Sequence, residues 1–392
     1  MSKLIDLVNK LCPNGVEFKK LEELLEYEQP TKYIVQSTKY DNSYNIPVLT
    51  AGQSFILGYT NEQNGIYNAS KVNPVIIFDD FTTGFHWVEF DFKVKSSAIK
   101  MLRPKCDKIN FKYIYYAMCT LNFMPGSHVR HWISIYSQLF VPVPPMEVQN
   151  EIVHILDDFT LLSAELSAEL KARKKQYEYY RDELIKNVPN AEIKTLGEIS
   201  TDMYRGAGIK RDEVTVNGIP CVRYGEIYTS YNVTFDECIS HTNEEKISSK
   251  KYFEYGDVLF AITGESVEEI AKSIVYLGNE KCMAGGDIVV MKHNQNPKYI
   301  AYALSTTDAQ IQKSKGKIKS KVVHSSVPAI KEIKIPIPPL EEQERVASIL
   351  EKFDKLCNDI SEGLPAEIEA RKKQYEYYRD KLLTFKELKV ED

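Results

Sequence analysis

The amino-acid sequence predicts an α+β fold: two pseudo-repeated mixed α/β domains separated by two long antiparallel helices that form a coiled coil. Three observations support this fold class. The chain has 392 residues, enough for two or three domains that each bury a core. The segment ARKKQYEYYRD occurs twice without change, at residues 172–182 and 370–380. Apolar residues in heptad spacing precede both copies.

The repeat extends well upstream of this segment. PVPPMEVQNEIVHILDDF at 142–159 parallels PIPPLEEQERVASILEKF at 336–353, and GVEFKKLEEL at 15–24 resembles NAEIKTLGEI at 190–199. The repeating unit is therefore an opening segment, a variable region, a proline-rich hinge and a helix. The copies are offset by 194 residues at the hinge but by 198 residues in ARKKQYEYYRD, which indicates a four-residue insertion in the second helix.

We expect four parts: a first variable domain at residues 1–145, a central spacer helix at 146–187, a second variable domain at 188–339 and a C-terminal spacer helix at 340–386. The insertion coincides with Gly363 and Pro365, which should break or kink the last helix. A lone amphipathic helix is unstable in water, so the two helices should pair and carry the variable domains at opposite ends of a rod.

The heptad seam predicts which side chains pack between the helices or against a partner. They are the aliphatic and aromatic residues Ile152, Leu156, Phe159, Leu166, Tyr177, Tyr180, Val346, Leu350, Phe353, Tyr375 and Tyr378. In each variable region, strand-like runs such as 75–78 and 257–260 precede a helical pattern, near 113–121 and 299–305. Both regions therefore predict mixed sheets of one plan with different loops.

Local groups of basic residues stand out because the formal net charge is only −5. A run of alternating lysines surrounds Gly316: Lys313, Lys315, Lys317, Lys319 and Lys321. An extended strand would place all five on one face, where they could follow a phosphate backbone, although a solvated loop explains the run equally well. The corresponding place in the first region holds His128 and Arg130, which are suited to the same contacts.

Further polar side chains lie in or beside glycine-containing loops. Arg205, Arg211 and Arg223 could contact guanine in a major groove, and Gln53 and Asn61 could pair with adenine. Each of these residues, taken alone, is more often ordinary loop surface.

Several chemistries find no support in the sequence. There is no phosphate-binding glycine loop, no zinc-protease motif and no Cys/His metal spacing, so we predict no catalytic residue and no metal site. Asn296-Pro297-Lys298-Tyr299 is similar to the Asn-Pro-Pro-Tyr of adenine methyltransferases but lacks an accompanying cofactor loop, so we interpret it as a helix start. Seven scattered cysteines, no membrane span and no signal peptide favour the cytoplasm.

This duplicated plan, with Pro-x-Pro-Pro and ARKKQYEYYRD at matching places, resembles the specificity subunit of type I restriction-modification systems over essentially the whole chain. The resemblance implies that each variable region is a target recognition domain for one half of a bipartite site in double-stranded DNA. It implies that the helices set the spacer and dock two methyltransferase subunits, which restriction (motor-nuclease) subunits join. S-adenosylmethionine, ATP and magnesium would then be bound by those partners, and no cofactor by this chain.

Two other classes remain open at this point. A coiled-coil scaffold would explain the helices but not two divergent sheet domains with basic loops. An RNA-binding protein or a fused modification enzyme is the other alternative, and the latter would need a cofactor loop.

Overall fold

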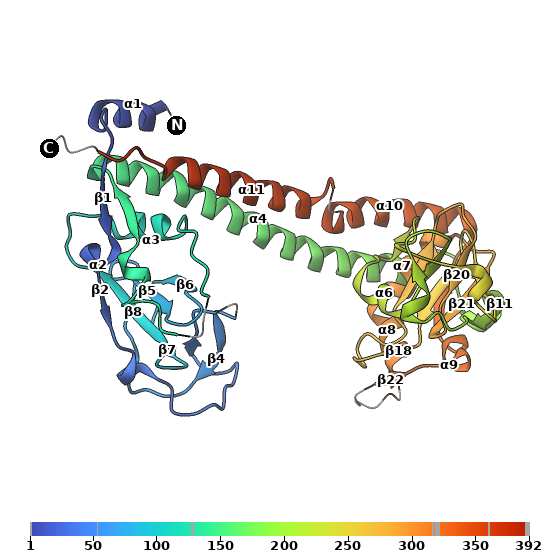
Figure 1. The fold of residues 1–392 in the computed structure, drawn as a ribbon. Coiled ribbons are helices and arrows are strands. Elements are labelled where there is room, and N and C mark those ends of the chain that lie inside the picture. Colours follow the sequence, from blue (N-terminus) through green and yellow to red (C-terminus); the bar gives the residue numbers. More distant parts are fainter. Residues whose placement is uncertain are drawn as a thin grey trace. The chain divides into compact units, whose positions relative to one another are not determined.

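The computed structural model describes residues 2–52, 54–126, 129–315, 317, 322–359 and 361–388 (Figure 1). The chain forms two compact units, each described here by itself. The first comprises 1–165 and 369–392, and the second comprises 166–368. Four predicted DNA-contacting residues, Gln53, His128, Lys319 and Lys321, lie outside the described residues.

The first unit folds its variable region into two sheets after helix α1 (Ser2–Leu11). The antiparallel sheet has the order β2-β8-β5-β6, with β2 Leu25–Glu28, β8 Ile99–Pro104, β5 Val75–Asp79 and β6 Phe85–Val88. The mixed sheet has the order β4-β3-β7, with β4 Ile56–Thr60, β3 Ile46–Leu49 and β7 Lys93–Val94. Strand β5 is central because four successive apolar side chains are buried on both of its faces.

The second unit contains the same two sheets with additional strands. The first sheet has the order β11-β21-β17-β19-β14, with β11 Ser200–Arg205, β21 Ile288–His293, β17 Val258–Ala261, β19 Ser273–Tyr276 and β14 Thr234–Phe235. The other has the order β12-β15-β13-β20-β16, with β12 Val214–Thr215, β15 Ser240–Thr242, β13 Ile219–Val222, β20 Cys282–Ala284 and β16 Tyr252–Phe253. Strands β14, β12 and β16 have no counterpart among the described strands of the first unit's two sheets, so the shared plan carries different additions.

A short antiparallel ribbon closes each variable region. It pairs β1 (Glu17–Lys20) with β9 (Phe140–Val143), and β10 (Glu192–Thr195) with β23 (Lys334–Ile337). The register is the same in both ribbons, since the first residue of one strand faces the last residue of the other. The weak similarity between the two opening segments thus corresponds to one repeated structural element, which continues into the short helices α2 (Leu21–Leu24) and α5 (Leu196–Ile199).

Each variable region has one largely buried helix after its sheets, α3 (Phe111–Met118) or α7 (Pro297–Ser305), and in the second unit two shorter helices, α8 (Thr307–Ser314) and α9 (Val327–Lys331), follow before the ribbon. The long helix α4 (Met146–Lys186) follows the first ribbon and contributes residues to both units. The predicted fold class, two mixed domains of one plan together with long helices, is confirmed.

The predicted break in the C-terminal helical segment at Gly363 and Pro365 is confirmed, because the segment forms two helices. Helix α10 (Leu340–Asn358) ends before the insertion, and α11 (Leu364–Leu382) begins directly after Gly363. A Cβ atom at Gly363 would lie 2.5 Å from the carbonyl oxygen of Lys355 and 2.7 Å from that of Asp359. Glycine is required because the backbone turns back onto the end of α10.

The prediction that the alternating lysines lie on an extended strand is wrong for Lys313, the first of them. Lys313 belongs to helix α8 (Thr307–Ser314), and its side chain is buried. Its ammonium group donates to the carbonyl of Leu304 at 2.8 Å and to the Ser273 hydroxyl at 3.0 Å. No helix in the described part of the chain is long and apolar enough to cross a membrane.

Candidate nucleic-acid interface

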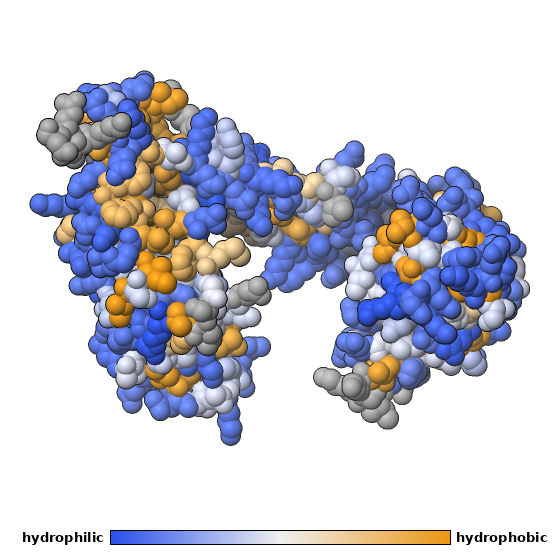
Figure 2. Space-filling view, viewed as in Figure 1, coloured by the Kyte–Doolittle hydropathy of each residue, from blue (hydrophilic) through white to orange (hydrophobic). Residues whose placement is uncertain are grey.

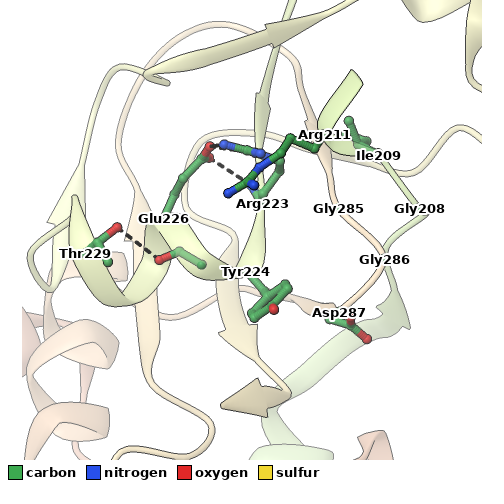
Figure 3. A pocket seen from close by; sticks show the side chains of 11 residues that line it. Gly208, Ile209, Arg211, Arg223, Tyr224, Glu226, Thr229, Gly285, Gly286 and Asp287 are labelled. Atoms are coloured by element: carbon green, nitrogen blue, oxygen red, sulfur yellow. Dashed lines mark hydrogen bonds and ion pairs between the residues drawn. The ribbon is translucent and has the colours of Figure 1, made fainter. Parts of the chain in front are cut away.

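The second variable domain contains a pocket of about 550 Å³ in which glycine backbone and arginine side chains meet (Figure 3). The residues that line it come from three segments, namely the turn into a 3-10 helix after β11, the short helix after β13 with the residue before it, and the loop between β20 and β21: Gly208, Ile209, Arg211, Arg223, Tyr224, Gly225, Glu226, Thr229, Gly285, Gly286 and Asp287. Two of the three arginines predicted from the sequence therefore line one pocket, and the third contacts its wall.

Arg223 is held in a fixed orientation at the pocket. It follows β13 and precedes helix α6 (Tyr224–Thr229). Its backbone N–H donates to Glu226 at 2.9 Å, and its Nε and Nη2 atoms both lie 2.8 Å from Glu226 Oε1. Glu226 is buried and also accepts a hydrogen bond of 2.7 Å from the Ser240 hydroxyl, so the carboxylate that orients Arg223 is itself positioned.

Arg205 supports the glycine wall of the same pocket. At the end of β11, its guanidinium donates to the carbonyl of Gly286 and pairs with the Asp287 carboxylate. A Cβ atom on Gly206 would lie 2.2 Å from the carbonyl oxygen of Gly285. Two backbone segments approach each other closely here, which only glycine permits.

Arg211 differs from the other two arginines. It begins the short 3-10 helix η3 (Arg211–Glu213) and is exposed. Within the part of the chain that the structure describes, it forms no ion pair, whereas Arg205 and Arg223 each have a carboxylate partner. A free guanidinium beside two oriented ones is suited to a phosphate or to the acceptor edge of guanine, because its planar donors match both.

The first variable domain presents its predicted residues separately. Asn61 and Arg130 are both exposed, and neither lines the pocket of about 370 Å³ that Lys32, Ile34, Gln36, Glu62, Gln63, Asn64, Gly65 and Lys93 form in this unit. That pocket contains an ion pair of 2.8 Å between Lys93 and Glu62. Asn61 directly precedes Glu62 of this ion pair in the sequence.

The segment of the first unit that contains Arg130 is anchored to the sheet directly after this residue, at His131 and Trp132. Asp80 accepts hydrogen bonds from the backbone of Trp132 at 2.9 Å and, through its own carbonyl, from the backbone of His131 at 2.8 Å. Its carboxylate pairs with Lys100 at 3.1 Å, and both side chains are buried. In the second unit, the backbone of Ser325 donates to the carbonyl of Ile262 at 2.8 Å. The segments that end at His131 and at Ser325 are therefore held at equivalent places, because Asp80 directly follows β5 and Ile262 directly follows β17.

Of the predicted lysines, Lys315 is exposed after the end of α8 and Lys317 is half-buried. Lys313 is unsuited to phosphate contact, because burial lowers its pKa to about 7 and its ammonium group is already hydrogen-bonded inside the unit. Among the described residues, no group of three or more His, Cys, Asp or Glu side chains could hold a metal ion.

The predicted helix seam is formed within each unit. Ile152 and Leu156 are buried in the first unit, where Tyr375 and Tyr378 pack against the same core. Tyr177, Val346 and Leu350 are buried in the second unit, with Phe353 beside them. Phe159 stacks on Tyr378 and Tyr180 stacks on Phe353, while Leu166 is half-buried.

Sequence reasoning missed a second repeated motif. NFKYIYYA at 110–117 and NPKYIAYA at 296–303 are offset by 186 residues, and both bond to a buried glutamine, Gln149 or Gln343. The near-identity of the two segments was the signal. Asn296 caps helix α7, which confirms that Asn296-Pro297-Lys298-Tyr299 is a helix start.

The comparisons with known proteins define the class of this chain. The family model described as the type I restriction modification DNA specificity domain matches residues 13–173 and again residues 189–370, so the chain belongs to this family. It is 42% identical over 402 residues to the specificity subunit of type I restriction enzyme EcoR124I/EcoR124II from Escherichia coli, covering 98% of both chains.

Solved structures show the same fold. The S subunit of a type I restriction-modification system from M. genitalium aligns with a TM-score of 0.52 and 15% identity, over 95% of this chain and 97% of that chain. A chain from a structure that describes complex assembly and conformational transition of the type I R-M system aligns with a TM-score of 0.61 and 14% identity, over 95% of this chain and 98% of that chain.

Proposed function

We propose that this chain is the DNA-reading subunit of a type I restriction-modification complex. The domains at residues 1–145 and 188–339 each bind one half of a bipartite site in double-stranded DNA. The observation that carries the proposal is the duplication itself: two domains share sheet order and ribbon register, but differ in loops and additional strands. A common frame with different loops is suited to two different half-sites.

The arginine pocket supports DNA as the ligand of the second domain. Arg205 and Arg223 are oriented by carboxylates, and Arg211 presents a free guanidinium beside them. Preoriented arginines lose little side-chain entropy when they bind a base edge or a phosphate. The E. coli relative is named as a specificity subunit of a restriction enzyme. Because the similarity covers 98% of both chains, we extend that role to the whole of this chain.

Docking of two identical methyltransferase subunits is supported by side chains that packing does not explain. Both copies of ARKKQYEYYRD expose the same residues: Lys174, Lys175, Glu178 and Tyr179, and Lys372, Lys373, Glu376 and Tyr377. Tyr179 is 62% exposed and Tyr377 is 60% exposed. Hydrophilic residues cover most of the long helices visible in Figure 2, and two matching exposed tyrosines fit one kind of partner bound twice.

In this proposal the chain works in the cytoplasm and performs no chemistry. The helical segments at 146–187 and 340–386 set the spacer between the half-sites. S-adenosylmethionine is bound by the methyltransferase subunits, and ATP and magnesium by restriction subunits that join the complex. This division of labour is supported by the family and by the lack of cofactor motifs in the sequence.

The test uses the chain assembled with its methyltransferase subunits. The complex should bind a duplex carrying both half-sites at least tens of times more tightly than duplexes in which either half is scrambled, since each lost base contact costs about 1–3 kcal/mol. Equal affinity for all three duplexes at moderate salt would overturn the proposal. Equal affinity for a matching RNA would point to the RNA-binding alternative.

A further inference from the structure

The second repeated motif connects each variable domain to its long helix through the same set of hydrogen bonds. In the first unit, Asn110 caps helix α3: its side-chain oxygen accepts from the backbone of Lys112 at 2.9 Å and of Tyr113 at 3.1 Å. In the second unit, Asn296 caps α7 and accepts from the backbone of Tyr299 at 2.9 Å. A capped helix start is a well-defined point of attachment.

A buried glutamine from the long helix binds each of these caps. Gln149 of α4 accepts from the backbone N–H of Asn110 at 2.9 Å and donates to the carbonyl of Pro144 at 2.7 Å. Gln343 of α10 accepts from the backbone N–H of Asn296 at 2.9 Å and donates to the carbonyl of Pro338 at 2.8 Å. Their exposed fractions are 1% and 0%. Both glutamines therefore join the variable domain, the proline hinge and the helix at one buried point.

Two further contacts repeat around each glutamine. The hydroxyl of Tyr113 donates to the carbonyl of Pro142 at 3.0 Å, and that of Tyr299 donates to the carbonyl of Pro336 at 2.9 Å. An ion pair joins the same small helix to the long one, between Lys112 and Asp157 at 2.8 Å and between Lys298 and Glu351 at 2.9 Å. We name these residues, with the asparagine and the glutamine, the clamp of each unit.

The clamp restricts geometry in a way that apolar packing does not. Apolar contacts tolerate small rotations and slides, whereas hydrogen bonds weaken steeply as their angle is lost. A buried amide that loses its partner is costly, so the bonded arrangement is strongly preferred over its neighbours. The loops of the two units diverge, yet both clamps retain the bonds from the glutamine to the cap and the hinge, the bond from the tyrosine to the hinge, and the ion pair; Gln343 in addition donates to Gln295 at 2.8 Å. Apolar packing alone would not require two domains with different loops to form matching hydrogen bonds.

We propose that Gln149 and Gln343 are positioning residues that fix the angle of each recognition domain on its own helix, and thereby the DNA spacer length that the complex accepts. This inference rests on the proposed function. One base pair of spacer moves a half-site by about 3.4 Å and rotates it by roughly 35°. A recognition domain held by directional hydrogen bonds cannot shift to follow a half-site displaced in this way, so the complex binds that duplex less tightly. A recognition domain that lacks these bonds can shift, so the complex also binds DNA with the altered spacer.

The experiment measures how the assembled complex ranks three duplexes whose spacers have the preferred length, one base pair fewer and one base pair more. The variant Gln343→Leu keeps the side-chain volume but removes all three hydrogen bonds of the amide, to Asn296, Pro338 and Gln295. We expect the preference for the correct spacer to fall by roughly threefold or more. Discrimination against scrambled half-sites should stay at its original value, because the base-contacting loops are untouched.

The matched control is Gln310→Leu. Gln310 lies in α8, and its side-chain amide donates a hydrogen bond of 3.2 Å to the carbonyl of Ile270 within the variable domain, so the substitution removes no bond of the clamp. This variant should keep the full spacer preference. If Gln343→Leu does not fold, Lys298→Met removes the half-exposed ion pair of the clamp and should lower the spacer preference to a smaller extent.

The outcomes separate the two proposals. An unchanged spacer preference in a folded clamp variant would overturn the positioning role and leave the proposed function intact. A parallel loss of spacer and half-site discrimination would also overturn it, because that result is a general structural effect. A wild-type complex without spacer or half-site preference would overturn the proposed function itself.

Discussion

The ring of Phe159 stacks on the ring of Tyr378, with centroids 5.5 Å apart and planes at 23°. In the second unit, Phe353 stacks on Tyr180 at 6.3 Å and 24°. Phe159 is equivalent to Phe353 in the repeat, and Tyr378 to Tyr180. The same phenylalanine–tyrosine pair therefore forms twice. In the first unit α4 provides the phenylalanine and α11 the tyrosine, whereas in the second unit α10 provides the phenylalanine and α4 the tyrosine.

This relationship predicts a measurable coupling. In a double-mutant cycle with Phe159→Ala and Tyr378→Ala, the interaction should contribute about 0.5–1.5 kcal/mol to the free energy of unfolding, as stacked rings do. Urea denaturation followed by circular dichroism measures it. Leu161→Ala, at a position that is 59% exposed, serves as the control and should change stability by less than about 0.5 kcal/mol. A coupling of zero would show that the stacked rings do not stabilise the helices.

Loss of the free guanidinium in the arginine pocket should weaken DNA binding. We expect Arg211→Gln to lower the affinity of the complex for its duplex by about tenfold, a change of roughly 1.4 kcal/mol in binding free energy. If Arg211 binds phosphate, the salt slope should fall by about one. If it binds a base, one position of the half-site should lose its preference instead. Lys246→Gln removes an exposed charge outside this pocket and is the control; equal effects of both changes would exclude a specific role for Arg211.

The buried Lys313 predicts a pH dependence of stability. Burial lowers its pKa from the ordinary 10.5 to about 7, so above pH 7 the unfolded chain binds this proton more strongly than the folded chain. The free energy of unfolding contributed by this group therefore rises with pH from about 7 towards 10. Relative to Lys313→Met, the wild-type chain should gain about 2 kcal/mol between pH 7 and pH 9.

Urea denaturation of both proteins at the two pH values measures this gain. The exposed Lys315 provides the control, because Lys315→Met should change stability by the same amount at both. A constant difference between the wild-type chain and Lys313→Met would show that Lys313 keeps its ordinary pKa in the folded state.

The exposed tyrosines of the repeated motif predict how partner subunits assemble. Tyr179→Ala and Tyr377→Ala should each weaken the binding of one methyltransferase subunit, by about tenfold or more for a central aromatic contact. Native mass spectrometry should then show complexes with one methyltransferase subunit for each single variant, and the free chain for the double variant. Retention of two subunits by the double variant would place the docking surface elsewhere.

The sequence predicted those features that depend on local patterns. Heptad spacing placed Phe159 and Tyr378 in the seam, and the break at Gly363 followed from residue type. Arg211 and Arg223 were found because arginine beside glycine indicates a ligand-facing loop. That these two line one pocket, with Arg205 supporting its wall, depends on strand pairing across more than 80 residues, which no local pattern contains.

Other features could not be predicted, for physical reasons. Alternating lysines do not distinguish a strand from a helix end, and Thr306 caps α8, whose final turn buries Lys313. The buried pair of Asp80 and Lys100 joins positions whose proximity arises only when the sheet forms. Gln149 and Gln343 were overlooked because glutamine is usually exposed.

The most direct test of the central claim is methylome sequencing of a host that carries this chain together with its methyltransferase subunit. Two domains of one plan, each binding its own half-site, predict a methylated motif of two short specific sequences separated by an unspecific spacer of constant length. Exchange of residues 200–335 for those of a relative should then change one half of the motif and leave the other half unaltered. A single uninterrupted motif, or a change in both halves after the exchange, would contradict the account.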